Sequence, residues 1–249
     1  MKKLFIFITS NFDKSRINKN FLDGTYNHLF DEIKILNEND LDNYIKPIID
    51  NIMQKYGNRG YGYWIWKSYI IMKELEQMNE NDILVHLDSH CYLENIEDRF
   101  DDIINNLNNL EKPIMVGWCA EEFTDLNMTS KPLREYIEKY FNFKFSKELL
   151  EKPQVEAGIL FMRKNDFVVT LIKQWFDIML NGMDYVSDMY INKKYNHPEF
   201  HGNRHDQSVL SLLCKYYNID VTKEFDWWTF NHFGDKQVVW SDKDPRYKA

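Results

Sequence analysis

The stretch from residue 82 to 93 constrains the fold of this chain more than any other. It contains an apolar run, Ile83 to Leu87, that ends abruptly in Asp88, Ser89 and His90. Ligands of open α/β sheets bind at the carboxyl ends of strands. Asp88 and His90 offer a carboxylate oxygen and an imidazole nitrogen, which suit Mn²⁺ or a similar divalent ion, and such an ion commonly binds substrate phosphates. The stretch therefore indicates a strand that ends at a metal site, although a carboxylate at a strand end also commonly caps a helix or forms a turn.

Apolar runs of strand length alternate with segments of helical spacing along the rest of the chain. This spacing predicts strands at 4–9, 33–36, 83–87, 113–118 and 155–162, helices at 63–78, 103–110, 166–180 and 206–217, and a polar loop at 121–130. Such a rhythm predicts an α/β sandwich with a mostly parallel central sheet. No linker or internal repeat interrupts the pattern, so we expect a single domain over residues 1–249.

Composition excludes several classes of function. The 249-residue chain has a net charge of −8 and no dense block of Lys and Arg, which argues against nucleic-acid binding. Its three cysteines are few and far apart, as expected in a reducing compartment without disulfides. The apolar run near the N-terminus is too short for a signal peptide, and no run has the length of a membrane helix. We therefore expect a cytoplasmic protein without a transmembrane segment.

The segment from Arg59 to Lys67 combines two glycines, four aromatic residues and a cation at each end. Glycines allow the backbone to pass close to a ligand, and the rings of residues such as Tyr63 offer stacking faces. Arg59 and Lys67 would neutralise a diphosphate that a metal ion balances only in part. The alternative is a structural aromatic cluster with Lys67 in solvent, and for Trp64 we prefer this structural interpretation.

Two further segments place polar groups where a ligand would reach them. Glu156 precedes Ala157 and Gly158 at the start of a predicted strand, and it would accept hydrogen bonds from sugar hydroxyls or act as a base or nucleophile. The alternative is an exposed Glu156 beside a packing glycine. Asp206 and Gln207 begin a predicted helix, whose N-terminus favours anions and presents unpaired N–H groups. Asp206 would serve there as an N-cap, as a catalytic group, or as both.

Taken in order, these motifs resemble those of nucleotide-sugar glycosyltransferases with the GT-A fold. The chain has Asp-x-His at a strand end, then Glu-Ala-Gly-Ile-Leu, Asp-Gln-Ser-Val-Leu, and Asn-His-Phe-Gly-Asp-Lys at 231–236. The glycogenin and bacterial lipopolysaccharide galactosyltransferase group has Asp-x-Asp, Asn-Ala-Gly-hydrophobic, Asp-Gln-Asp-hydrophobic-Leu and His-x-x-Gly-x-x-Lys in the same order. The segment Gly-Tyr-Gly-Tyr-Trp-Ile-Trp-Lys is similar to sequences of bacterial and viral polysaccharide glycosyltransferases. The resemblance runs from Thr9 to about Trp240 and implies a GT-A-like, Rossmann-like α/β/α sandwich, with a nucleotide-binding part at about 1–120 and an acceptor and catalytic part at about 121–249.

The resemblance also implies metal and phosphate ligands. Asp88 and His90 match the metal-binding Asp-x-Asp, and His232 matches the third metal ligand. Gly234 and Lys236 match the late motif that binds the donor phosphates, although this motif is one residue shorter here. His90 replaces the second aspartate of the family, and this replacement lowers the anionic charge available to Mn²⁺ or Mg²⁺.

The remaining matches imply the contacts of the donor sugar and its nucleoside. Asp206 and Gln207 match the polar pair beside the transferred sugar. Thr9 and Ser10 fall where the family holds the base and ribose, and Glu156 replaces the asparagine of the family. From these matches we expect Asp206, Gln207 and Glu156 to be the catalytic residues.

The sequence thus predicts a hexosyltransferase that uses a UDP-sugar donor, a divalent metal ion and a glycan or glycolipid acceptor. Metal and cations would stabilise the UDP leaving group, and the resemblance implies retention of anomeric configuration. A non-catalytic carbohydrate- or nucleotide-binding module is the alternative, because it would explain the degenerate motifs. A metal-dependent hydrolase built on Asp88, His90 and His232 is a third possibility, but the chain lacks the His-Glu-x-x-His signature of such enzymes.

Overall fold

The structure of the chain is a computed structural model that describes residues 4–9, 24, 26–88, 91–93, 100–221 and 239–241, with the backbone alone for 4–9, 92–93 and 239–241. Its strands are β1 (Leu4–Thr9), β2 (Glu32–Leu36), β3 (Ile83–Asp88), β4 (Cys91–Leu93), β5 (Ile114–Met115), β6 (Ile159–Arg163) and β7 (Val239–Ser241). Its α-helical elements are α2 (Ile45–Tyr56), α3 (Gly60–Tyr63), α4 (Ile65–Gln77), α5 (Phe100–Asn109), α6 (Asp125–Met128), α7 (Lys131–Phe141), α8 (Lys147–Leu150), α9 (Asp166–Asn181), α10 (Met183–Val186) and α11 (Asp206–Tyr216). Short 3₁₀ turns are η2 (Glu38–Asp40), η3 (Asp188–Tyr190) and η4 (Lys193–Tyr195).

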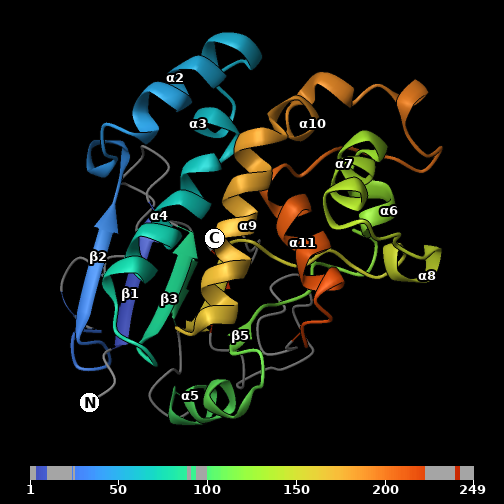
Figure 1. The fold of residues 1–249 in the computed structure, drawn as a ribbon. Helices are drawn as coiled ribbons and strands as arrows, with labels where there is room; N and C mark the ends of the chain where they lie inside the picture. The colour runs from blue at the N-terminus through green and yellow to red at the C-terminus, as the bar shows by residue number, and fades with distance from the viewer. Residues whose placement is uncertain are drawn as a thin grey trace, which may run out of the picture.

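The large sheet has five strands in the order β2-β1-β3-β6-β5, and β2 lies at the edge of the molecule in Figure 1. Strand β1 pairs in parallel with both β2 and β3, whereas β6 is antiparallel to both β3 and β5. The predicted α/β architecture is therefore confirmed, but the sheet is mixed, with β6 reversed between two strands of the other direction. Strands β4 and β7 pair antiparallel in a separate two-stranded sheet.

Hydrophobic cores cover both faces of the large sheet. Side chains alternate between the two faces along a strand, and the two cores follow this alternation. Leu84 and Leu160 belong to the core that also contains α4, α9 and α11. Val85 and Phe161 point to the other face and belong to the core that contains α5. The sheet thus lies between helical layers, as in an α/β/α sandwich.

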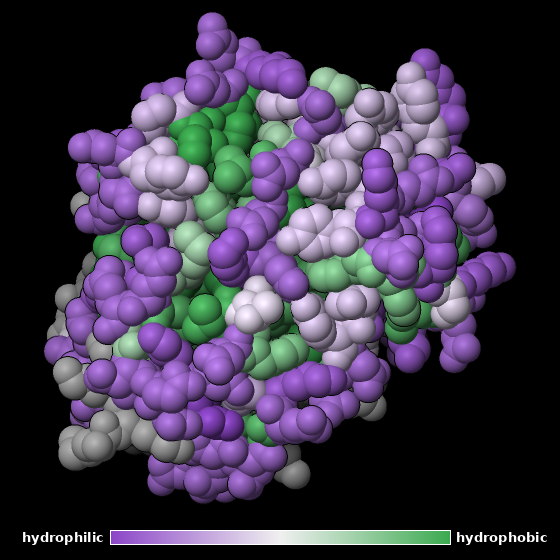
Figure 2. All heavy atoms as spheres, viewed as in Figure 1, coloured by the Kyte–Doolittle hydropathy of each residue, from purple (hydrophilic) through white to green (hydrophobic). Residues whose placement is uncertain are grey.

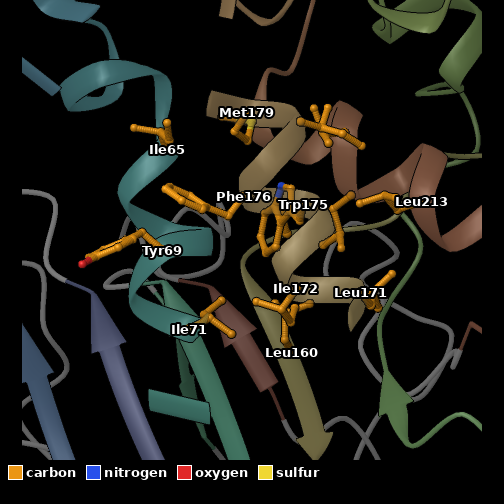
Figure 3. Close-up of a cluster of buried hydrophobic side chains, with 14 of the residues drawn as sticks. Ile65, Tyr69, Ile71, Leu160, Leu171, Ile172, Trp175, Phe176, Met179 and Leu213 are labelled. Carbon is orange, nitrogen blue, oxygen red and sulfur yellow. The ribbon is translucent and has the colours of Figure 1, made fainter. Parts of the chain in front are cut away.

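Helix α9 is the central element of the larger core, and Figure 3 shows its aromatic side chains between α4, β6 and α11. Trp175 is fully buried, and the ring centroid of Phe176 lies 5.3 Å from that of Tyr69 on α4. The indole Nε1 of Trp175 donates a 3.0 Å hydrogen bond to the backbone oxygen of Asp206. The hydrophobic core therefore holds the start of α11 in a defined place.

Several predicted boundaries need correction. The strand predicted at 113–118 contains only β5, and the strand predicted at 155–162 begins at Ile159, because Val155 forms only an isolated bridge to Trp118. The loop predicted at 121–130 contains the short helix α6, whose first residue, Asp125, is buried. Helices α2 and α7 were absent from the prediction, although Ile45, Ile49 and Ile52 of α2 are buried at helical spacing.

The surface of the described part of the chain is mostly polar. Figure 2 shows hydrophilic residues over most of one face, with small hydrophobic areas between them. Exposed large side chains such as Tyr44, Tyr140 and Met189 come from different elements. No helix in the described ranges has the length and apolar character needed to cross a membrane.

Candidate active site

A buried lysine joins two carboxylates at the carboxyl end of β3. Lys67 Nζ lies 3.0 Å from Asp88 Oδ1 and 3.2 Å from Asp206 Oδ2, and it donates a 3.3 Å hydrogen bond to the backbone oxygen of Ala157. The side chain of Lys67 is 4% exposed, and that of Asp206 is 8% exposed. The alternative of a solvated Lys67 is therefore wrong. Three motifs that are distant in sequence meet around one ammonium group.

Ordinary secondary-structure periodicity brings these groups together. Leu84, His86 and Asp88 share one face of β3 because side chains alternate along a strand, and Leu84 lies in the core with α4. Lys67 lies one helical turn before the buried Ile71 on α4. Side chains four residues apart lie on the same helix face, so Lys67 and Ile71 both face the sheet. Lys67 thus reaches the last residue of β3.

Asp206 enters the site as the first residue of α11, because the N-cap is His205. The interpretation of Asp206 as the N-cap is therefore wrong. His205 has φ 52° and ψ −113°, and its side chain makes no capping hydrogen bond. Its Nδ1 instead lies 2.7 Å from the backbone oxygen of Val186. Since a carbonyl can only accept, Nδ1 carries the proton, and this bond fixes the orientation of the ring directly before Asp206.

Burial and charge set the protonation of the cluster. Burial raises the pKa of Asp206 to about 6, the negative charge of Asp88 adds to the increase, and Lys67 opposes it. The pKa of Lys67 is raised above its ordinary value because the attraction of Asp206 and Asp88 outweighs burial. Burial lowers the pKa of His86 to about 3. At neutral pH the cluster therefore contains a protonated Lys67, an ionised Asp206 and a neutral His86.

Asp206 Oδ2 retains capacity to accept a hydrogen bond. This buried oxygen has no aligned hydrogen-bond donor within the part of the chain that the structure describes, although Lys67 Nζ lies 3.2 Å away. A buried acceptor without a donor is costly. The ammonium group of Lys67 offsets this cost by its charge, so the burial of Asp206 Oδ2 depends on Lys67.

Arg59 and Tyr63 lie on the other side of His205 and contact Asp188 rather than Asp88. Arg59 Nη1 lies 3.0 Å and 3.1 Å from the two carboxylate oxygens of Asp188. Tyr63 Oη donates to the backbone oxygen of Tyr56 at 2.9 Å and lies 3.3 Å from Asp188 Oδ2, and its ring packs edge-on against His205 at 4.9 Å. Asp188 also lies 3.5 Å from His205 Nε2. The charge of Arg59 is thus partly balanced by Asp188 before any ligand binds.

The segment that carries these residues begins with a left-handed helical turn. Residues 60 to 64 all have positive φ values, between 51° and 82°. The turn is closed by hydrogen bonds from Tyr63 N to Arg59 O at 2.7 Å and from Trp64 N to Gly60 O at 3.1 Å. Left-handed conformation costs roughly 1–2 kcal/mol per non-glycine residue. Such strain is concentrated at functional sites, so this turn supports a functional assignment of the segment.

Trp64 and Gly60 hold the left-handed turn together. A Cβ atom at Gly60 would lie 2.4 Å from the Trp64 ring, so the ring packs directly on the glycine backbone. The Trp64 ring also stacks on the His205 ring, with ring centroids 5.7 Å apart. The structural interpretation that we preferred for Trp64 agrees with this position.

Glu156 and Gln207 meet at a buried cysteine. Cys119 Sγ donates a 3.0 Å hydrogen bond to Glu156 Oε1 and accepts hydrogen bonds from Gln207 Nε2 at 3.2 Å and Arg204 Nη1 at 3.4 Å. Glu156 is 5% exposed, so the alternative of an exposed strand-start residue is wrong. Burial and the charge of Glu156 raise the pKa of Cys119 well above its ordinary value, so the thiol keeps its proton. No feature of the sequence drew attention to Cys119.

The remaining predicted ligands are described only in part. Thr9 lies beside Asp88 in the register of the parallel strands β1 and β3, so the end of β1 borders the cluster. Ser10, His90, His232, Gly234 and Lys236 lie outside the described residues. Within the described ranges, no three His, Cys, Asp or Glu side chains form a group that could hold a metal ion. Asp88 is thus the one member of the predicted metal set that can be placed, and it is paired with Lys67.

Solved structures of three glycosyltransferases are similar to this chain. Mouse xyloside xylosyltransferase 1 in its apo form has 12% identity and a TM-score of 0.46, over 96% of this chain and 97% of that one. A glycosyltransferase involved in glycosylation of the major capsid of PBCV-1 has 13% identity and a TM-score of 0.34, over 80% of each chain. The galactosyltransferase LgtC, in complex with donor and acceptor sugar analogs, has 12% identity and a TM-score of 0.38, over 96% of this chain and 86% of that one.

The sequence matches no protein-family model and no curated protein. Because the identities and TM-scores of the three structures are low, we assign function from the residues of this chain.

Proposed function

We propose that this chain is a glycosyltransferase that moves a hexose from a UDP-sugar to a glycan or glycolipid acceptor. The observation that carries the proposal is the meeting of Lys67, Asp88 and Asp206 at the carboxyl end of β3. Ligands of open α/β sheets bind at such strand ends. Buried charges of this kind have strongly shifted pKa values, which are concentrated at functional sites. Thr9, at the end of β1, lies beside Asp88 in the strand register, and we propose that the nucleoside binds next to it.

Each residue of the cluster has a role in this proposal. Asp206, whose side chain is 8% exposed, accepts a hydrogen bond from a sugar hydroxyl. Lys67 keeps Asp206 ionised and fixes its position. Glu156 and Gln207, which are both bound to Cys119, face the transferred sugar as further polar contacts. Arg59 binds the diphosphate and gives up part of its ion pair with Asp188 when it does so.

We further propose that Asp88 binds a divalent ion together with His90 and His232. One carboxylate and two imidazoles form a donor set that suits Mn²⁺, and Mg²⁺ is the alternative. When bound, the ion would neutralise charge on the leaving diphosphate. Both oxygens of Asp88 lie near Lys67. A metal ion bound to Asp88 would therefore weaken the Lys67–Asp88 ion pair, and Lys67 would then pair mainly with Asp206.

A thermal-shift panel tests the proposal. UDP-, GDP- and CMP-sugars are compared with and without Mn²⁺, because a ligand that binds only the folded state raises the melting temperature. We expect the largest increase for a UDP-sugar with Mn²⁺. An equal increase with UDP and excess chelator would remove the metal from the proposal, and no increase with any donor would contradict the nucleotide site.

Turnover separates an enzyme from a binding module. We expect slow hydrolysis of the UDP-sugar in the absence of acceptor, whereas a binding module would stabilise without hydrolysis. The stereochemistry follows from proton NMR of the first product formed from an α-linked donor. We propose retention, hence an α product; a β product would assign Asp206 as the general base that deprotonates the acceptor hydroxyl.

A further inference from the structure

A buried polar network lies behind Gln207 and contains none of the residues singled out from the sequence except Gln207 itself. Gln154 is fully buried, and its Oε1 accepts a 3.0 Å hydrogen bond from Gln207 Nε2. Its Nε2 lies 3.0 Å from Asp125 Oδ1 and 3.2 Å from the backbone oxygen of Met128. Asp125 is itself fully buried and lies 2.5 Å from Lys215 Nζ. The network thus connects a buried ion pair to a proposed sugar contact.

The chemistry of the acceptors determines the direction of every amide in this network. Met128 O is a carbonyl, and Asp125, which is paired with Lys215, is a carboxylate, so both can only accept. The end of Gln154 that faces them must therefore be the NH₂ group. Gln154 Oε1 then points to Gln207, which must donate through Nε2.

We infer that Gln154 and Asp125 are positioning residues that orient the Gln207 amide. The NH₂ group of Gln207 donates to two buried acceptors within the described residues, Gln154 Oε1 and Cys119 Sγ. Gln207 is only half-buried, so its Oε1 is left to accept from a ligand hydroxyl. A freely rotating amide would present NH₂ to the ligand as readily as oxygen, and hydrogen bonding of one end removes this ambiguity. Only the expected effect on kcat rests on the proposed function; the orientation of the Gln207 amide does not.

A double-mutant cycle tests the kinetic consequence. Gln154→Met keeps the size of the side chain and removes its hydrogen bonds. We expect kcat to fall about tenfold with little change in the KM for the donor, which is the pattern of an interaction made in the transition state. If Gln154 acts through Gln207, Gln154→Met should lower kcat less than about twofold in the Gln207→Met background, because coupled residues are not additive. Equal fold-losses in both backgrounds would overturn the inference.

A matched control separates positioning from a general loss of stability. Gln174 is half-buried on α9 and accepts a 2.7 Å hydrogen bond from Tyr217 Oη. Gln174→Met therefore removes a glutamine hydrogen bond outside the network, and kcat should stay within about twofold of the parent chain. A tenfold loss in this control would show that the effect of Gln154→Met is not specific.

A spectroscopic measurement tests the orientation without any assumption about activity. The protein is labelled with ¹⁵N in its glutamine side chains and measured by NMR. The NH₂ signals of Gln207 are assigned as those that disappear in the Gln207→Met variant. We expect Gln154→Met to speed their exchange with water about tenfold or more, because one of their acceptors is lost. Unchanged exchange would overturn the inference. If the protein transferred no sugar from any donor, the proposed function would be refuted, but the exchange measurement would still test the orientation of the Gln207 amide.

A second variant serves if Gln154→Met does not fold. Gln207→Glu places a carboxylate oxygen against Gln154 Oε1, and Gln154 cannot turn because Asp125 and Met128 hold its NH₂ group. We expect this variant to fold and to lose as much activity as Gln207→Met, although it keeps an acceptor oxygen. More than half of the parent activity in Gln207→Glu would overturn the inference.

Discussion

Replacement of Lys67 by methionine is the most direct test of the cluster at the end of β3. The change keeps the length and apolar stem of the side chain and removes the charge. It leaves two carboxylates, 8% and 19% exposed, without the cation between them. Loss of one member of a buried ion pair typically costs about 3–5 kcal/mol. We therefore expect Lys67→Met to lower the free energy of unfolding at neutral pH by about this amount.

The pH dependence of this loss has a definite direction. Asp206 has a pKa of about 6 in the folded chain against an ordinary value of 3.8, a difference that corresponds to about 3 kcal/mol. Between these values the folded state binds more protons than the unfolded state, so the free energy of unfolding falls as the pH rises. Without Lys67, the repulsion from Asp88 raises the pKa of Asp206 further. The variant should thus regain stability as the pH falls from about 7.5 to 5, and it should regain more than the parent chain.

Urea denaturation at the two pH values measures both effects, and Lys34→Met is the matched control. Lys34 also contacts two carboxylates, Glu74 at 2.7 Å and Glu32 at 3.5 Å, but its side chain is 28% exposed. Exposed pairs contribute about 0–1 kcal/mol, so Lys34→Met should have a small effect at both pH values. Equal losses in Lys67→Met and Lys34→Met, or a Lys67→Met loss that does not depend on pH, would refute the reasoning.

Three further outcomes follow from the site. Asp206→Asn should lower kcat about a hundredfold, roughly 2.7 kcal/mol of transition-state stabilisation, with UDP affinity unchanged in calorimetry; unchanged turnover would exclude the role of Asp206. Because the proposal requires the anion of Asp206, whose pKa burial raises, kcat should fall as acid protonates this group and level off at higher pH, and initial rates in Asp206→Asn should show no such inflection. Gly60→Ala should lower stability by about 2 kcal/mol or more in urea denaturation, since the residue has φ 53° and its new Cβ would meet the Trp64 ring; Gly202→Ala, with open space around it, should have little effect.

Periodicity predicts much of the scaffold because local sequence and burial repeat with the same spacing. The strand Ile83–Asp88, which is buried at every position up to Leu87, follows from its continuous apolar run, and α4, α9 and α11 follow from helical spacing. Helix α2 obeys it too, and its buried Ile45 and Ile49 would have revealed it. Strand β5 is shorter than predicted because its pairing with β6 ends at Met115, and Trp118 forms only an isolated bridge with Val155. The identity of an element is thus more predictable than its limits.

The contacts of the site could not be predicted in this way, because they join residues that are far apart in the chain. A lysine is ordinarily exposed. Helical spacing places Lys67 on the face of α4 that packs on the sheet, but it does not indicate that Asp88 and Asp206 are the carboxylates that Lys67 meets there. Tyr61 and Trp64 adopt left-handed backbone that the sequence would assign only to glycine. Asp125 and Lys215 form a buried pair although each belongs to an amphipathic or polar segment. Only packing of the whole domain brings such groups into register.

The two buried lysines suggest why α11 carries charge at both ends despite the cost. At its first residue, Asp206 pairs with Lys67, and in its last turn Lys215 pairs with Asp125. Buried ion pairs add little net stability compared with apolar residues, but breaking one is expensive. The apolar face of α11, with Val209, Leu210 and Leu213 buried, would tolerate small shifts along α9. A slide of one turn, about 5.4 Å, would separate both ion pairs at once. The charges therefore fix the axial position of α11, and with it the position of Gln207 beside Gln154 and Cys119.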